Sequence, residues 1–527
     1  MSSAATFTRP KTAMKHILIL TLLGILLSPI TVLTQTGKQI SEEEFAAELD
    51  AYIRRTMEAV PELPSVGIVV VKDDRPIFIR AYGLANRETG TKADADTLYY
   101  IASSTKSYMA LAAALLDREG KIKLNDPVTK YARGVSFKSP IPENVTVRDL
   151  LTHTSALRNS PLTWRMAFSG EIDDRDMIRV LADGTSYSEQ NYGKYSYTNL
   201  GYNFYALLLK QSLGRKWQEV LQEKVFKPLG LKHTSAYVSK MRTAKFTLAE
   251  GYIFSPAAQA VTRSPIDKQD NNMQSAGGIF TSLTDLGRWL SVNMNNGRVS
   301  GKQVLPTEVM QAVHTGYTDT SREEGPFTGA GKYGLGWQIG RYRDENIVYH
   351  FGGFPGWSSH ISYMPEKKVG VAVMINESTA GGRIGHLLAT YVYDRFLGKE
   401  TSEAYTKQLK DLVGQYGKMK QAQIASVRQR ASRTSQLTRP LADYAGRYSN
   451  ELMGNIDIVV EKNTLGVRMG YIHAVSTPFT EKDTIRVEMT PGQGEVIKFD
   501  ANTDGRVDSL RYAGVTFKKT QPIVSGR

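Results

Sequence analysis

Hydrophobic residues follow different patterns in successive parts of this chain. Near the start, apolar residues recur at helical spacing over residues 45–60. Two β-branched runs follow, at 65–72 and 76–82, separated by Asp73-Asp74-Arg75. Such runs joined by a short polar turn predict a β-hairpin. Strand-like runs return much later, at 334–342, 347–351, 358–364 and 369–375.

From residue 126 to about 297 the pattern is helical. Apolar residues recur at spacings of three and four, and Gly214 and Gly230 stand where two helices would end. Strands at both ends of a segment with helices between them predict one antiparallel sheet with a helical insertion beside it. We therefore expect an α+β domain over residues 40–398, with a cleft beside the sheet. The helical segments are 145–151, 201–213, 217–229 and 283–294.

Two further parts follow this domain. Residues 399–439 carry apolar residues at spacings of four and three, which predicts a connecting helix that packs along one face and ends in a polar linker over 426–438. From 440 to 520, short strands alternate with turn signals, which predicts a small all-β domain, barrel or sandwich. The apolar positions of the helix are Tyr405, Leu409, Leu412, Tyr416 and Met419.

The first 34 residues are predicted to be a signal peptide. Basic residues precede an uncharged apolar core at 17–27, and Ser28-Pro29 ends that core. A basic start, a short apolar core and a breaker are typical of a secretory signal. An uncleaved anchor is the alternative, because 17–33 is just long enough to span a bilayer. In either case we expect a secreted or periplasmic protein.

Composition narrows the chemistry. The 527 residues contain no cysteine, which excludes thiol nucleophiles, disulfides and cysteine-bound zinc. The formal net charge is +14, and much of the excess lies in residues 403–439. We interpret this charge as a solvated basic surface, and expect no nucleic acid partner.

The strongest chemical signal lies in residues 99–120. Ser103 and Lys106 are three positions apart at the start of a predicted helix, which places their side chains next to each other. A buried lysine can take a serine proton, and backbone N–H groups at a helix start stabilise negative charge. Most Ser-x-x-Lys tetrapeptides are ordinary surface turns, so the rest of the chain has to support a nucleophilic serine.

Three further stretches give that support. Tyr197-Thr198-Asn199 opens a helix, Thr152-His153-Thr154-Ser155 follows a helix end, and His350-Phe351-Gly352-Gly353 ends a strand. Together with Ser103 and Lys106, these motifs resemble, in order and spacing, the class C β-lactamase family. This family of serine hydrolases includes penicillin-binding carboxypeptidases, D-aminopeptidases and esterases. The resemblance implies a β-lactamase/transpeptidase-like sheet with a helical subdomain, followed by a lipocalin-like β-domain.

The resemblance also implies a role for each site residue. Ser103 would attack the substrate carbonyl and form an acyl-enzyme, while Lys106 and Tyr197 would share the base and acid work. Asn199 would hydrogen-bond the substrate amide or Lys106. The backbone N–H groups of Ser103 and Gly353 would form the oxyanion hole. Which of Lys106 and Tyr197 takes the serine proton stays open at this point.

The third motif departs from the family pattern, which is often Lys-Thr-Gly and here reads His350-Phe351-Gly352. A histidine of ordinary pKa is mostly neutral at pH 7. His350 therefore suits an uncharged ester or amide, or orients Tyr197; a packed strand-end histidine is the other interpretation. The departure weakens the case for β-lactamase or carboxypeptidase activity. His153 is expected to be a structural loop residue.

Two motifs partly match a dinucleotide site and a calcium site, but we expect neither ligand to bind there. Residues 380–385 approach a dinucleotide fingerprint, but Ala380 replaces its first glycine and no βαβ unit continues. Residues 500–505 start like a calcium loop, but Arg511 stands where a bidentate Glu is needed, so we predict a hairpin turn. No other pattern suggests a metal site or a cofactor.

These observations predict an exported serine hydrolase that acts on an ester or amide, with D-amino-acid peptides among the candidates. Its partner would be a small-molecule or peptide substrate, with a cell-wall origin as one option. A β-lactamase or D-Ala-D-Ala carboxypeptidase is the alternative enzyme. A peptidoglycan- or peptide-binding protein without turnover is the alternative from another class.

Overall fold

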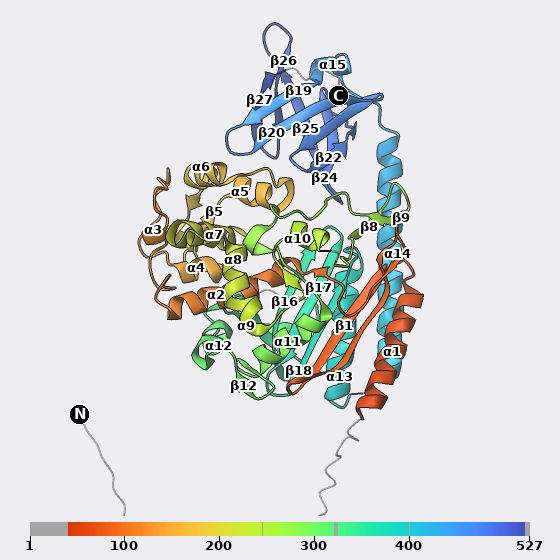
Figure 1. The fold of residues 1–527 in the computed structure, drawn as a ribbon. Coiled ribbons are helices and arrows are strands. Elements are labelled where there is room, and N and C mark those ends of the chain that lie inside the picture. The colour runs from red at the N-terminus through yellow and green to blue at the C-terminus, as the bar shows by residue number, and fades with distance from the viewer. Residues whose placement is uncertain (1–40, 245, 321–324, 400, 522–527) are drawn as a thin grey trace, which may run out of the picture. The chain divides into compact units, whose positions relative to one another are not determined.

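The computed structural model describes residues 41–244, 246–320, 325–399 and 401–521 (Figure 1). The predicted signal peptide lies outside the described residues. Within the described ranges, no helix is long and apolar enough to cross a membrane.

The centre of the fold is a nine-stranded antiparallel sheet in the order β13-β14-β15-β16-β17-β18-β1-β2-β3. The first hairpin joins the last strand, because β1 pairs with both β2 and β18. The prediction that strands from both ends of the domain form one antiparallel sheet is therefore confirmed. The strands are β1 (Ser65–Lys72), β2 (Arg75–Asn86), β3 (Thr91–Lys92), β13 (Thr318–Thr320), β14 (Thr328–Tyr333), β15 (Gln338–Tyr342), β16 (Glu345–Phe354), β17 (Trp357–Met364) and β18 (Val369–Ile375).

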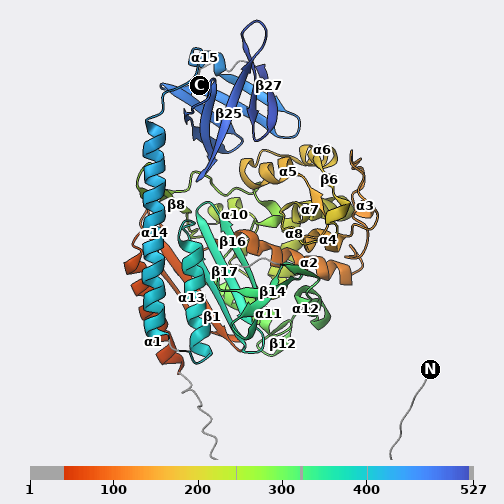
Figure 2. The same cartoon turned by 180° about the vertical axis from the view of Figure 1, so that it is seen from behind.

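Helices cover both faces of this sheet. Alternate side chains of a strand point to opposite faces, and the two apolar sets of β1 enter two separate cores. Val66, Ile68 and Val70 pack with α1 (Glu42–Ala59), α13 (Gly381–Phe396) and α14 (Ser402–Ala431). Val69 and Val71 pack with α2 (Thr105–Arg118) and α11 (Leu283–Met294). Figure 2 shows α13 and α14 across the first face.

The helical part lies between β3 and β13 in the chain, as predicted. Gly214 and Gly230 have φ of 65° and 63° and cap two of its helices, which confirms their predicted C-terminal role. Besides α2 and α11, its helices are α3 (Val128–Tyr131), α4 (Val147–Leu151), α5 (Ser160–Trp164), α6 (Asp174–Gly184), α7 (Leu200–Leu213), α8 (Trp217–Leu221), α9 (Lys227–Leu229), α10 (Val238–Thr243) and α12 (Thr307–His314).

Short helices and strands join these elements. π-helical turns extend α5 and join α8 to α9, and 3₁₀ turns precede α2 and α7. These short elements are η1 (Ala102–Ser104), η2 (Arg165–Ser169), η3 (Glu189–Asn191), η4 (Gln222–Phe226), η5 (Gln274–Ala276), β4 (Tyr99–Tyr100), β5 (Leu157–Arg158), β6 (Ser186–Tyr187), β7 (Thr234–Ser235), β8 (Tyr252–Ser255), β9 (Ala260–Arg263), β10 (Phe280–Thr281), β11 (Arg298–Val299) and β12 (Lys302–Gln303).

The glycine-rich stretch at 380–385 forms the start of α13 and already has an anion at its N-terminus. The Glu377 carboxylate accepts the backbone N–H groups of Thr379, Ala380 and Gly381 at 2.6, 2.7 and 3.1 Å. A helix N-terminus attracts anions such as a pyrophosphate. The Glu377 carboxyl group therefore occupies the position at this helix start where a pyrophosphate would bind.

The C-terminal part is a nine-stranded antiparallel sheet, nearly closed into a barrel, in the order β22-β21-β20-β19-β27-β26-β25-β24-β23. It follows α14, which runs further than predicted, to Ala431, and the short α15 (Leu441–Tyr444). The sequence did not predict β22 and β23, which are short. The strands are β19 (Gly446–Asn450), β20 (Gly454–Glu461), β21 (Thr464–Met469), β22 (Ile472–Val475), β23 (Thr477–Pro478), β24 (Thr484–Thr490), β25 (Gln493–Ala501), β26 (Val507–Tyr512) and β27 (Val515–Gln521).

The loop that resembled a calcium site is a hairpin turn. It joins β25 to β26, which pair antiparallel. Arg511 donates to both carboxylate oxygens of Asp500, at 2.9 and 3.0 Å. The Arg511 guanidinium therefore occupies the space beside Asp500, the carboxylate that would come first in a calcium loop. The prediction of a hairpin turn is confirmed.

The barrel packs on the helical part of the first domain. The Tyr471 N–H donates to the Ser169 carbonyl, and a Cβ on Gly470 would lie 2.3 Å from that oxygen. Arg165 donates to the Leu452 carbonyl at 3.2 Å. The described residues from 41 onwards accordingly form one compact unit. The domain boundaries at 398/399 and 439/440 stay predictions.

Two partly buried histidines, His314 and His386, predict loss of stability in acid. Burial lowers the pKa of His314 and of His386 from 6.5 to about 4. Between those pH values the unfolded chain binds more protons than the folded one, so the stability present above pH 6.5 is lost as the pH falls towards 4. We expect each histidine to cost on the order of 2 kcal/mol over this range.

Thermal unfolding of the wild type and of His314→Asn from pH 7.5 to 4.5 measures this effect. The variant should lose part of the pH dependence that the wild type shows. Equal slopes in both proteins would contradict the assignment.

Candidate active site

The start of α2 holds Ser103 and Lys106 as a contacting pair. Ser103 lies in the 3₁₀ turn η1, and the Lys106 side chain is fully buried. Lys106 Nζ donates to Ser103 Oγ at 3.2 Å, to Asn199 Oδ1 at 2.9 Å and to the Ala276 carbonyl at 2.8 Å. An ammonium group has three donors and no acceptor. The two carbonyl oxygens can only accept, whereas the Ser103 hydroxyl can donate as well as accept, so these partners fit both the charged and the neutral form of Lys106.

The three acceptors come from separate segments of the chain. Asn199 precedes α7, and Ala276 ends η5. Met273, just before that turn, and Gln274, its first residue, adopt positive φ of 60° and 46°. Non-glycine residues rarely take this conformation, and strained backbone concentrates at functional sites.

The segment around Ser103 is held against the sheet. Ser104 Oγ donates to the His350 carbonyl at 3.0 Å, and Ser359 Oγ donates to the Ile101 carbonyl at 2.9 Å. A Cβ on Gly352 would lie 2.1 Å from the Ile101 oxygen. Gly352 of the third motif is therefore the residue that allows β16 to approach Ser103 this closely.

Tyr197 lies beside Lys106 on a loop fixed by His153. Lys106 Nζ is 4.9 Å from the centre of the Tyr197 ring. The His153 and Tyr197 ring centres are 4.4 Å apart. On the two sides of Tyr197, the Ser196 N–H donates to the His153 carbonyl and the Thr198 N–H donates to His153 Nδ1. His153 is thus a loop residue, as expected, and contacts the tyrosine of the site directly.

His350 lies below the site rather than on its surface. Its side chain is 3% exposed, and its ring centre is 6.3 Å from that of Tyr197. Nε2 is 3.3 Å from Tyr333 Oη, and Nδ1 is 2.9 Å from the Phe351 carbonyl. Tyr333 Oη also lies 3.2 Å from His153 Nε2. Of the two functional interpretations, this geometry favours the one in which His350 orients Tyr197.

Sequence reasoning did not identify Tyr333. Tyr333 is the last residue of β14. It begins the stretch Tyr333-Gly334-Leu335-Gly336-Trp337, which lies in the sequence between the Tyr197 and His350 motifs. Gly336 has φ of 74°, and a Cβ there would lie 2.5 Å from the Lys106 carbonyl. Gly334 and Gly336 were the signal in the sequence that could have pointed to Tyr333, because a glycine in a strand often marks a place where another backbone approaches closely.

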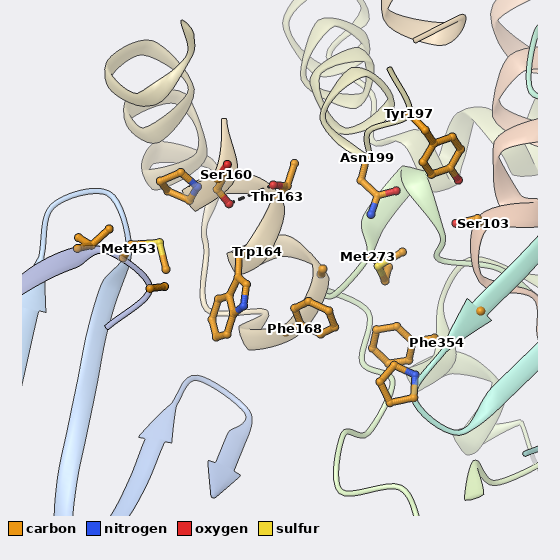
Figure 3. A pocket seen from close by; sticks show the side chains of 16 residues that line it. Ser103, Ser160, Thr163, Trp164, Phe168, Tyr197, Asn199, Met273, Phe354 and Met453 are labelled. Carbon is orange, nitrogen blue, oxygen red and sulfur yellow. Dashed lines mark hydrogen bonds between the residues drawn. The ribbon is translucent and has the colours of Figure 1, made fainter. Parts of the chain in front are cut away.

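A cavity of about 480 Å³ opens at Ser103 (Figure 3). Its walls contain Ser103, Tyr197, Asn199 and Gly353, but no Lys, Arg, His, Asp or Glu side chain among the described residues. His350 does not line it. The remaining lining residues are Ser160, Pro161, Thr163, Trp164, Ala167, Phe168, Met273, Phe354, Pro355, Met453, Ala513 and Val515.

Part of this wall comes from the barrel. Met453 precedes β20, and Ala513 and Val515 lie at the turn between β26 and β27. Trp164 and Phe168 pack against the core of the barrel while also lining the cavity. Figure 3 shows these two aromatic rings between Met453 and the side of the cavity that holds Ser103. No pattern in the sequence predicts this contribution, because it depends on how the barrel packs on α5 and η2.

The fold and the site together define a β-lactamase and penicillin-binding-protein-like protein. The family model described as Beta-lactamase matches residues 53–389. The chain therefore belongs to the Beta-lactamase family, whose members are generally hydrolytic serine enzymes.

Individual relatives are distant. Unguisins hydrolase ungD' of Aspergillus campestris is 25% identical over 403 residues, 73% of this chain and 72% of that protein. Protein flp of Staphylococcus aureus is 24% identical over 315 residues, 60% of each chain. The octameric penicillin-binding protein homologue of Pyrococcus abyssi superposes with a TM-score of 0.59 at 23% identity, covering 90% of this chain and 99% of that one. This structural likeness confirms the expected fold.

The two glycines of the third motif predict opposite responses to a methyl group. Gly352→Ala would force β16 away from the Ile101 carbonyl, and we expect a loss of about 2–4 kcal/mol of stability and a displaced Ser103. A Cβ on Gly353 meets no atom within 4 Å, so Gly353→Ala should fold normally.

Melting temperature and covalent labelling of Ser103 measure both variants. Equal stability of the two variants would show that the close approach at Gly352 is not required.

Proposed function

We propose that this protein is a serine hydrolase that cleaves an uncharged ester or amide through an acyl-enzyme on Ser103. The observation that carries the proposal is the 3.2 Å contact between Lys106 Nζ and Ser103 Oγ at the base of an open cavity. A buried ammonium next to a hydroxyl stabilises the negative charge that develops on the serine oxygen.

The arrangement supports a two-step mechanism. Ser103 Oγ attacks the carbonyl carbon, and its proton passes to Tyr197, which in this proposal starts as the phenolate paired with the Lys106 ammonium beside its ring. The N–H groups of Ser103 and Gly353 stabilise the tetrahedral oxyanion. Tyr197 then protonates the leaving alcohol or amine, and the acyl group stays on Ser103.

Water completes the cycle. It attacks the acyl-enzyme carbonyl, gives its proton to Tyr197, and releases a carboxylic acid as the Ser103 hydroxyl is restored. Lys106 and Asn199 stay hydrogen-bonded throughout and hold the serine and tyrosine in position.

The walls of the cavity support a neutral substrate with an apolar group. Trp164, Phe168 and Met453 offer aromatic and thioether surface to such a group. A carboxylate-bearing substrate would need a cation there, and no Lys, Arg or His lines the described wall. This disfavours penicillins and D-Ala-D-Ala peptides. The name of the fungal relative, a hydrolase of unguisins, fits the general class of hydrolysis.

Export is part of the proposal and rests on the basic and apolar pattern of residues 1–34. We infer a secreted or periplasmic enzyme with a small-molecule or peptide substrate.

Removal of the nucleophile tests the reaction. Ser103→Ala should abolish both ester hydrolysis and covalent labelling while the melting temperature stays unchanged, because only the atom that forms the acyl bond is lost. Intact mass after incubation with a fluorophosphonate or an activated ester detects the adduct. Hydrolysis by the variant above a few per cent of the wild-type rate would exclude Ser103 as the nucleophile.

A charge placed on the barrel turn tests the substrate wall. Ala513→Lys puts an ammonium at the edge of the cavity and should raise kcat/KM for an anionic ester, relative to its neutral analogue, about two- to fivefold at low salt. Ala513→Leu is the matched control and should leave that ratio unchanged. If the lysine variant also leaves the ratio unchanged, the turn does not border the bound substrate.

A further inference from the structure

His153 holds the chain on both sides of Tyr197. Its carbonyl accepts the Ser196 N–H at 2.9 Å, and its Nδ1 accepts the Thr198 N–H at 3.3 Å. The backbone of His153 has φ of 62°, which directs both acceptors to the same loop. The position of the Tyr197 ring therefore depends on the orientation of one imidazole.

The protonation of that imidazole follows from its partners. A backbone N–H can only donate, so Nδ1 of a neutral His153 is the acceptor and Nε2 carries the hydrogen. Nε2–H then donates to Tyr333 Oη, 3.2 Å away. The Tyr333 hydroxyl accepts this hydrogen bond, so its own hydrogen can be donated to a second acceptor.

His350 supplies that second acceptor. Its Nδ1 lies 2.9 Å from the Phe351 carbonyl, which can only accept, so Nδ1 carries the hydrogen. Nε2 is then an acceptor for the Tyr333 hydroxyl at 3.3 Å. The hydrogen bonds form one directed chain from the Thr198 amide through His153, Tyr333 and His350 to the Phe351 carbonyl.

This chain is closed to water. His153 and His350 are 2% and 3% exposed, and Tyr333 is fully buried. Burial raises the pKa of Tyr333 well above its usual value, so the hydroxyl keeps its hydrogen. Because buried donors and acceptors are costly when unpaired, a change at one member has to alter the others.

We propose that Tyr333 is a positioning residue that links His153 to His350 and thereby fixes Tyr197 against Lys106. The inference rests on the proposed function, because it assigns Tyr333 a role in placing the base of that reaction. Tyr333 itself touches neither the nucleophile nor the cavity wall in the described contacts. The rings of Tyr195 and Tyr202 and the Lys106 ammonium surround the same site.

Two substitutions break the same link from opposite ends. Tyr333→Phe removes the shared hydroxyl and keeps the ring. His153→Asn keeps a side-chain acceptor near the Thr198 N–H and tolerates positive φ, but loses the donor to Tyr333. Each should lower kcat roughly ten- to a hundredfold, with KM changed less than about twofold.

The double variant distinguishes one shared hydrogen bond from two independent effects of the single substitutions. If the two residues act through one hydrogen bond, Tyr333→Phe with His153→Asn should be no slower than the slower single variant. Tyr205→Phe is the matched control, because the buried Tyr205 hydroxyl makes no hydrogen bond among the described residues. A full-rate Tyr333→Phe enzyme, or multiplied losses in the double variant, would overturn the proposal.

A second measurement needs no activity. The ¹⁵N shifts of labelled wild-type histidines should show His153 as the neutral Nε2–H form and His350 as the neutral Nδ1–H form, assigned through His153→Asn and His350→Asn. The same tautomer in both rings would overturn the chain. A wild type with these tautomers but no labelling of Ser103 would instead reject the proposed function.

Discussion

The buried amino group of Lys106 is the constraint on which the rest of the site depends. A polar group without water is costly unless its donors and acceptors find partners. Lys106 meets this requirement with oxygens from its own turn, from the start of α7 and from η5. The helical part must therefore pack against α2 in one arrangement, and that arrangement places Ser103 and Tyr197 beside the same cavity.

Glycines make the other contacts of the site equally specific. β16 reaches the segment before Ser103 because Gly352 has no Cβ, and β14 leads into Gly336, which passes the Lys106 carbonyl for the same reason. These close approaches bring His350 and Tyr333 under Tyr197. In this way one lysine and two glycines connect the sheet, the helix α2 that follows Ser103 and the Tyr197 loop into a single site.

Periodicity predicted much of the fold, because the residues concerned are buried in the regular way that each element requires. The runs at Ser65–Lys72, Leu283–Met294 and Val369–Ile375 have the predicted bounds. β13, β22 and β23 were missed because two to four residues carry no readable period. The helix α14 extends beyond its prediction since polar residues near its end are compatible with a solvated helix.

The sequence by itself determined the pairing of Ser103 with Lys106, because residues three apart at a helix start must lie together. It also placed Asn199 and His350 in motifs whose order implied one site. Only the tertiary structure decided that His350 lies beneath Tyr197, that Tyr333 joins it to His153, and that the barrel forms part of the cavity wall. These contacts join residues far apart in the chain, and their geometry follows from packing between elements rather than from any local pattern.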